Sequence, residues 1–347
     1  MRNYVNAPTA VLTAFLACSC SQQAPTAPAE PSAPRPAQPP KWGMVIHTGA
    51  GNFTLSGIAE RKDGMQAAMN DALTAGYKVL ADGGTSLDAV QAAIVILEDS
   101  PLFNAGKGAV FTHDGTNELD ASIMDGGTMR AGSVAGLKHI KNPIRLARLV
   151  MEKSPHVMMA GDGAEAFAKQ QGVEFVDQKY FYTDRAWQAL QADLAAEKKK
   201  AAQTDDHHGT VGAVALDQHG NLAAGTSTGG LSNKRFGRIG DSPIIGAGTY
   251  ANNQSCAISS TGIGEYWIRY TVAHDICARV QYRGMPIQAA ADAVVQDELK
   301  PVGGEGGVIG LDAHGNLMMS FNTSGMGRGY VGSDGKPMIM FTADDGK

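Results

Sequence analysis

Residues 210–230 read TVGAVALDQHGNLAAGTSTGG, which predicts a strand, a tight turn at HGN and a second strand. The pattern L-D-x-H-G-N-L returns almost unchanged in VIGLDAHGNLMMSFNTSG at 308–325, so the hairpin is repeated. Both turns use residues that tolerate a positive φ. We expect the two hairpins to be neighbouring ribbons of one antiparallel sheet.

Helical periods occur before and between the hairpins. Apolar residues at helical spacing predict a helix at 65–80, and a second helix opens at Thr85 with Asp88 as its capping-box partner. Further helices are expected at 143–153, 162–171, 187–194, 268–280 and 286–299. Of these, the segment 268–280 is apolar on most of its surface and is expected to be buried. Residues 43–51 predict the first strand, so helices and sheet segments form layers.

Composition excludes several classes of protein. The 347 residues are 43% hydrophobic and 18% charged, which is enough for a large core and excludes a disordered chain. The net charge of -5 shows no excess of positive charge that would bind nucleic acid, so we expect no nucleic-acid partner. Only Cys256 and Cys277 lie in the body of the chain, so a disulfide framework is excluded, and no Cys/His cluster has zinc-ligand spacing.

The first forty residues predict export. Residues 8–17 form an apolar run of signal-peptide length within an export signal at 1–20, and 21–42 is a Pro/Ala-rich tether. The run precedes Cys18 much as in a bacterial lipoprotein signal, whose cysteine is lipidated. A lipid anchor at Cys18 and an ordinary secretory signal both remain open. Either predicts a periplasmic or cell-envelope protein.

Two sequence matches to known site motifs lack the context that these motifs need. GTSTG at 225–229 matches the G-x-S-x-G nucleophile elbow with Ser227 as nucleophile, but the Gly- and Pro-rich sequence after it does not predict the required helix. GRGYVG at 327–332 matches G-x-G-x-x-G without a βαβ unit, and we interpret it as turn geometry.

A third candidate site is the Gly209-Thr210 junction, where a charged linker (197–209) meets a buried strand. In N-terminal nucleophile hydrolases, a Thr at such a junction is freed by self-cleavage, and its own α-amine then acts as base. An α-amine has a reference pKa of ~8, so much of it is neutral at physiological pH. The local sequence leaves two interpretations open: a nucleophile, or a strand that begins at a β-branched residue.

An ordered set of motifs extends over most of the chain. They are NAGKGAVFT (104–112), ELDASIMDG (118–126), GTVGAVALD (209–217), GTSTGG (225–230), GRIGDSPIIGAGTYANN (237–253) and STGIGE (260–265). From 43 to 330 the chain resembles the plant-type asparaginase and isoaspartyl peptidase family of N-terminal nucleophile hydrolases. The resemblance implies an α+β fold, a four-layer αββα sandwich, and self-cleavage between Gly209 and Thr210 into an α part, 43–209, and a β part, 210–347.

The resemblance also implies catalytic roles. Thr210 would be the nucleophile, and Thr228 would hydrogen-bond near its hydroxyl and amine. Thr261 and the Gly262 amide would form the oxyanion hole, because a main-chain amide and a hydroxyl can hold a developing negative charge.

Substrate contacts are implied at four further positions. Arg238 would grip the α-carboxylate of the substrate and Asp241 its α-amino group, since a guanidinium fork matches a carboxylate and a carboxylate suits an ammonium. Gly264 would also contact the substrate, and Asn104 would lie near the active centre. Without the resemblance, Arg238 and Asp241 could equally form a surface ion pair in a glycine-rich loop.

Bacterial members imply a structural sodium and no organic cofactor. Its ligands would be main-chain carbonyls of the loop 97–107, namely those of Leu97, Glu98, Ser100, Phe103, Ala105 and Lys107. Thr48 stands where relatives commonly carry Gly, and we expect it to affect self-processing more than later chemistry. His47 and the pair at 207–208 are interpreted as packed or solvated histidines.

The implied activity is cleavage of isoaspartyl dipeptides and L-asparagine, both small molecules, through an acyl-enzyme on Thr210. The α and β chains would stay together, as a dimer of αβ units. The alternatives are a glycosylasparaginase-like amidase, a serine hydrolase using Ser227, and a non-catalytic tethered ligand-binding protein.

Overall fold

The computed structural model of the chain describes residues 42–51, 55–199 and 209–345. The predicted export signal with Cys18, almost all of the tether and the histidine pair at 207–208 lie outside the described residues. No helix in the described part is both long and apolar enough to cross a membrane.

The larger sheet has eight strands in the order β12-β11-β1-β5-β6-β2-β3-β4, and all its pairings are antiparallel except β3–β4. In that order the strands are β12 (Met338–Thr342), β11 (Gly325–Gly332), β1 (Gly43–Gly51), β5 (Val211–Leu216), β6 (Leu222–Thr228), β2 (Leu119–Asp125), β3 (Ala131–Leu137) and β4 (Met158–Ala160). The hairpin of 210–230 therefore lies at the centre of this sheet.

The second sheet has four antiparallel strands. They are β10 (Leu317–Phe321), β9 (Gly306–Asp312), β8 (Cys256–Gly262) and β7 (Thr249–Ala251). The repeated hairpin at 308–325 is thus β9–β10, and the expectation that both hairpins share one sheet is wrong. The repeat specifies the turn and the flanking strands, but the partners of each strand are set by distant parts of the chain.

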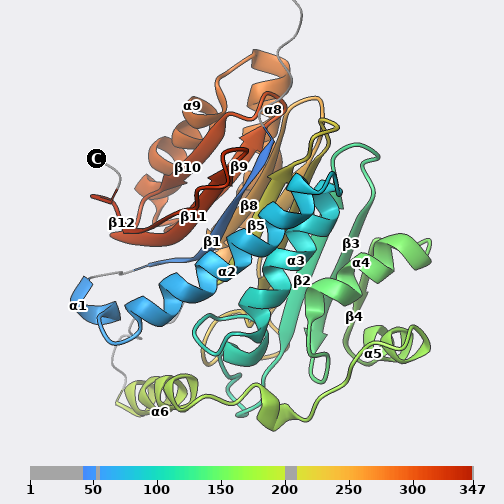
Figure 1. Cartoon of the computed structure of the whole chain (residues 1–347). Helices are drawn as coiled ribbons and strands as arrows, with labels where there is room; N and C mark the ends of the chain where they lie inside the picture. The colour runs from blue at the N-terminus through green and yellow to red at the C-terminus, as the bar shows by residue number, and fades with distance from the viewer. Residues whose placement is uncertain (1–41, 52–54, 200–208, 346–347) are drawn as a thin grey trace, which may run out of the picture. The chain divides into compact units, whose positions relative to one another are not determined.

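Helices cover the outer faces of both sheets (Figure 1). The helices on the side of the larger sheet are α1 (Leu55–Ile58), α2 (Lys62–Ala81), α3 (Ser86–Asp99), α4 (Pro143–Lys153) and α5 (Gly161–Gln170), and α6 (Asp184–Lys198) packs against Phe111 beyond the end of the sheets. Those on the side of the smaller sheet are α7 (Gly264–Tyr270), α8 (Val272–Arg283) and α9 (Ile287–Asp292), followed by a π-helix, η3 (Ala293–Leu299). Short 3-10 turns are η1 (Gly106–Gly108), η2 (Gln178–Tyr180) and η4 (Lys300–Val302).

Three apolar clusters separate these layers. Met44 and Ile46 of β1 pack with α2, α3 and α4, whereas Val45, between them in sequence, packs in the cluster between the two sheets. Successive residues of a strand point to opposite faces, so both faces of β1 are buried. The third cluster joins β8 and β9 to α8 and α9. The predicted four-layer αββα sandwich is confirmed.

Of three predictions about short segments, one is confirmed and two are wrong. Thr85 caps α3 as expected, because its hydroxyl oxygen accepts a hydrogen bond of 3.1 Å from the Asp88 amide. The helix predicted at 268–280 is instead broken at Thr271, whose φ is +47°, and α8 buries only one face. GRGYVG forms most of β11 rather than a turn, and its three glycines lie in a strand between β1 and β12.

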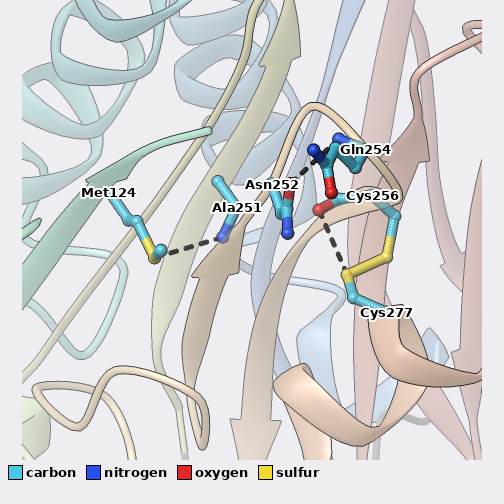
Figure 2. The surroundings of a disulfide bond; sticks show 6 residues. All are labelled: Met124, Ala251, Asn252, Gln254, Cys256 and Cys277. Atoms are coloured by element: carbon cyan, nitrogen blue, oxygen red, sulfur yellow. Dashed lines mark hydrogen bonds between the residues drawn. A yellow bond between two sulfur atoms is a disulfide. The ribbon is translucent and has the colours of Figure 1, made fainter. Parts of the chain in front are cut away.

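Cys256 and Cys277 form a disulfide with a Cα–Cα distance of 5.3 Å (Figure 2). The bond joins β8 to α8 beneath the turn at Gln254. A single bond is not the disulfide framework that the sequence excluded. It fastens a helix to the strand that ends at Gly262.

Candidate active site

Thr210 and Thr228 face each other at the centre of the larger sheet. Val211 pairs with Ser227 in the β5–β6 ladder, so Thr210, one residue earlier, comes opposite Thr228. Their hydroxyl oxygens are 3.1 Å apart, and both residues are buried. The predicted contact between the two threonines is therefore present.

The Gly209 carbonyl oxygen is surrounded by three donor groups. They are Thr210 Oγ1 at 2.8 Å, Thr228 Oγ1 at 3.1 Å and Asn104 Nδ2 at 2.8 Å. The Asn104 amide is held in this orientation, because its Oδ1 accepts a hydrogen bond from the Val110 amide at 2.9 Å. Donors aimed at one carbonyl oxygen polarise it and would stabilise an oxyanion there.

Gly49, which was not among the predicted site residues, packs against the same peptide bond. Its φ is +113°, and a Cβ built on it would lie 3.0 Å from Gly209 Cα. Thr48 does not occupy this place: its hydroxyl lies 3.7 Å from Met69 Sδ. A glycine inside a strand is a signal of such a close approach. The effect of Thr48 on self-processing stays a prediction.

A small pocket brings the predicted residues together. Its lining comprises Gly209, Thr210, Thr228, Gly230, Leu231, Arg238, Gly240, Asp241, Ser242 and Gly262. Thr261 is not part of this lining, but it precedes Gly262 on β8 and its buried hydroxyl has no hydrogen-bond partner among the described residues. Since buried hydroxyls are normally satisfied, the unpaired Thr261 hydroxyl is an exception that a bound molecule could explain.

Opposite charges meet in the lining of this pocket. Arg238 and Asp241 both line it, and a Cβ built on Gly264 would lie 2.9 Å from both Arg238 Nη2 and Asp241 Oδ1. Burial raises the pKa of Asp241 to about 7. Arg238 donates from Nε and Nη2 to the two carboxylate oxygens of Glu265, each at 2.9 Å. An arginine beside a carboxylate suits a zwitterionic amino-acid end.

A row of buried hydroxyls, which the sequence did not predict, lies between the two sheets. His47 Nε2 lies 2.9 Å from Ser259 Oγ, which is 2.7 Å from Thr226 Oγ1. The row continues through Thr249 and Ser122, with oxygen separations of 2.6 and 2.8 Å. Burial lowers the pKa of His47 to about 3, so its ring is neutral. The interpretation of His47 as a packed histidine is confirmed.

Ser227 has no access to the pocket. Its side chain is fully buried, and its hydroxyl donates to Glu98 Oε1 at 2.7 Å. Burial raises the pKa of Glu98 to about 8, so at neutral pH this carboxyl is mostly protonated and cannot take a proton from the serine. A buried hydroxyl bonded to a carboxyl, without a following helix, does not form a nucleophile elbow. The serine-hydrolase alternative is wrong.

Two carbonyls of the loop predicted to hold sodium lie close against its glycines. A Cβ built on Gly106 would lie 2.3 Å from the Glu98 carbonyl oxygen, and one on Gly108 would lie 2.1 Å from that of Phe103. No group of three or more His, Cys, Asp or Glu side chains among the described residues could hold a metal ion. Both carbonyls belong to residues predicted to bind sodium, and main-chain oxygens are the kind of ligand that suits a hard cation.

Comparison with known proteins agrees with this geometry. Residues 40–341 match the asparaginase family. Isoaspartyl peptidase of Escherichia coli is 48% identical over 302 residues, covering 83% of this chain and 93% of the relative. Isoaspartyl peptidase/L-asparaginase of Mus musculus is 41% identical over 283 residues, covering 82% of this chain and 86% of the relative. On the extent of these matches, the chain belongs to the asparaginase family of N-terminal nucleophile hydrolases.

Proposed function

We propose that this chain is an autoprocessing hydrolase that cleaves isoaspartyl dipeptides and L-asparagine through an acyl-enzyme on Thr210. One observation carries the proposal: the Thr210 hydroxyl lies 2.8 Å from the oxygen of the preceding carbonyl, in a pocket that also contains Arg238 and Asp241. The names of the relatives support the same activity.

Self-cleavage begins when Thr210 Oγ1 attacks the carbonyl carbon of Gly209. The hydroxyl proton passes to the amide nitrogen as the C–N bond breaks, which leaves an ester between Gly209 and Thr210. Water then hydrolyses the ester, giving a chain that ends at Gly209 and a free α-amine on Thr210. Asn104 Nδ2 and Thr228 Oγ1 already donate to the oxygen that becomes negative.

Turnover uses the new α-amine as general base. It takes the proton of Thr210 Oγ1 as this oxygen attacks the side-chain carbonyl of the substrate, and the proton goes to the departing nitrogen. Ammonia leaves from asparagine, and an amino acid leaves from an isoaspartyl dipeptide. Thr261 and the Gly262 amide hold the oxyanion, and water hydrolyses the β-aspartyl ester to release aspartate.

Specificity comes from the charged side chains that line the same pocket as Thr210. Arg238 binds the free α-carboxylate of the aspartyl residue, and Asp241 binds its α-ammonium. Asp241 Oδ2 is buried and has no hydrogen-bond partner among the described residues, which suits a site that a ligand completes. An internal peptide bond offers neither charge, so the enzyme acts on free aspartyl ends.

Three further features belong to the proposal. Main-chain carbonyls of the 97–107 loop hold a structural sodium, which keeps Asn104 in place. The α and β parts remain associated, as a dimer of αβ units. The protein is exported, because residues 8–17 form a signal-like run and the Cys256–Cys277 disulfide suits an oxidising compartment. Fractionation of cells producing the wild type and Cys18→Ala separates a lipid-anchored protein from a free periplasmic one.

A denaturing gel with N-terminal sequencing tests the nucleophile. Purified protein should give two fragments, one of which begins at Thr210. Thr210→Ala should stay uncut and inactive, and Thr210→Ser should cut slowly, since only a hydroxyl can perform the acyl shift. Ser227→Ala serves as the control and should still cut itself. A main fragment that begins elsewhere would contradict the assignment, and a fully uncut wild type would favour a binding protein.

The substrate class needs a separate experiment. Arg238→Ala should lose activity on isoaspartyl dipeptides and asparagine alike while still cutting at Gly209, because the precursor presents no α-carboxylate. Unchanged kcat/KM in Arg238→Ala would refute the proposed grip.

A further inference from the structure

Arg238 is held from outside the pocket by a residue to which no role has yet been assigned. Its Nε and Nη2 donate to Glu265 Oε1 and Oε2, both at 2.9 Å. Glu265 lies in the first turn of α7, and its side chain is 52% exposed, against 17% for Arg238. The arginine is thus mostly enclosed, whereas its partner faces solvent.

A guanidinium group has two edges that can bind a carboxylate in a bidentate manner. Glu265 occupies the edge made by Nε and Nη2, which leaves the edge that contains Nη1. This second edge lies against Gly240, because a Cβ built there would be only 2.6 Å from Nη1. Gly240 also lines the pocket with Thr210. The free edge therefore adjoins the pocket.

Glycine at 264 keeps the space between the two charges open. A Cβ at this position would come within 2.9 Å of Arg238 Nη2 and of Asp241 Oδ1. Any side chain here would fill the gap that a ligand bridging the two groups must enter. In the segment 262–265, Gly264 thus leaves space for a ligand, and the next residue, Glu265, binds Arg238.

We propose that Glu265 is a positioning residue that fixes Arg238 with its Nη1 edge toward the pocket, so that the substrate's α-carboxylate meets a preoriented guanidinium. The inference rests on the proposed function, in which Arg238 binds that carboxylate. A free arginine side chain has large rotamer entropy, and binding must overcome it unless the protein has already ordered the group. Glu265 restricts the conformation of Arg238 before the substrate binds, and it does not itself contact the substrate.

The expected effect is confined to substrate binding. Glu265→Ala should raise KM for both substrates about tenfold, the scale set by ordering one long side chain, with kcat changed less than about twofold. Glu265→Gln should fall between wild type and Glu265→Ala, because its amide has one acceptor for two donors. Cleavage at Gly209 should be normal in both variants, which also reports a correct fold. Glu298→Ala, which breaks an ion pair with Arg279, is the matched control and should leave KM unchanged.

A four-variant comparison tests whether Glu265 acts through Arg238. The wild type, Glu265→Ala, Arg238→Ala and the double variant are assayed on a β-aspartyl dipeptide and on the same dipeptide with its aspartyl α-carboxyl amidated. Glu265→Ala should lose kcat/KM only on the free carboxylate, and should cause no further loss in the Arg238→Ala background.

The outcomes separate this inference from the proposed function. If Arg238→Ala lowers kcat/KM but Glu265→Ala does not, Glu265 has no positioning role, whereas the grip by Arg238 stands. If Glu265→Ala lowers kcat/KM equally on the amidated dipeptide, or lowers it further without Arg238, Glu265 acts elsewhere and the inference is overturned. If Arg238→Ala has full activity, the proposed carboxylate site itself is refuted.

Discussion

Replacement of Asn104 by Ala should slow self-cleavage while the protein still folds. Asn104 Nδ2 is 2.8 Å from the oxygen that becomes negative when Thr210 attacks Gly209, and Asn104→Ala removes this donor. Thr228 Oγ1, at 3.1 Å, remains. Self-cleavage should therefore be slowed rather than abolished.

The magnitude follows from the value of one such donor. Loss of a single oxyanion donor typically costs ~3 kcal/mol of activation free energy, and each ~1.4 kcal/mol is a factor of ten in rate. We therefore expect about a 100-fold slower cut in Asn104→Ala. Asn104→Asp should be slower still, because it points a carboxylate at the carbonyl oxygens of Gly209 and Gly230, both of which now accept from Nδ2.

The chain offers a matched control in Asn117. This asparagine is also buried and bridges the same loop, since its Nδ2 donates to the carbonyls of Ala109 and Val110 at 3.0 Å each. Cell-free synthesis with a short labelling pulse, followed by denaturing gels, gives the rate of cleavage for each variant. Asn117→Ala should cut near the wild-type rate. Equal rates for Asn104→Ala and wild type would refute the oxyanion role, and equal slowing in both variants would mean that only loop stability matters.

Three other predictions concern pH and the disulfide. The pKa of His47 is lowered by burial to about 3, so the unfolded chain binds more protons between pH 3 and its ordinary value of 6.5, and stability falls as pH drops through this range. Because the full shift corresponds to roughly 4 to 5 kcal/mol, thermal melting of the wild type should fall more steeply from pH 7 to 4 than that of His47→Gln. The pKa of Asp241 is raised by burial to about 7, and only the ionised carboxylate binds an ammonium. Below that pH the α-amine of Thr210 is protonated as well. The value of kcat/KM should therefore fall with a two-proton slope. Stopped assays on Asp241→Asn should show a one-proton slope. The Cys256–Cys277 bond spans 21 positions and is worth ~3 kcal/mol by loop closure, so reduction, or replacement of both cysteines by Ala, should lower the melting temperature, and an unchanged melt in reductant would contradict a stabilising bond.

The sequence alone determined many of the local elements. The helical period at 65–80 became α2, and Thr85 capped α3, because capping and periodicity involve residues only a few positions apart. The hairpin at 210–230 formed as predicted, because its turn and its strands are specified by one short segment. Thr210 was predicted as the nucleophile from the ordered set of family motifs, because the junction between a charged linker and a buried strand left two interpretations open.

Only the tertiary structure decided which strands became neighbours and what surrounds the bond between Gly209 and Thr210. The two similar hairpins entered different sheets, and GRGYVG became a strand, because glycines carry no alternating pattern that a sequence could show. Asn104 donates a hydrogen bond to Gly209, which is 105 positions away in the sequence, and Gly49 of the first strand packs against Gly209. Such contacts are set by how two sheets and their helices pack, which depends on the burial of many residues at once, whereas the pattern of any single segment records only its own burial.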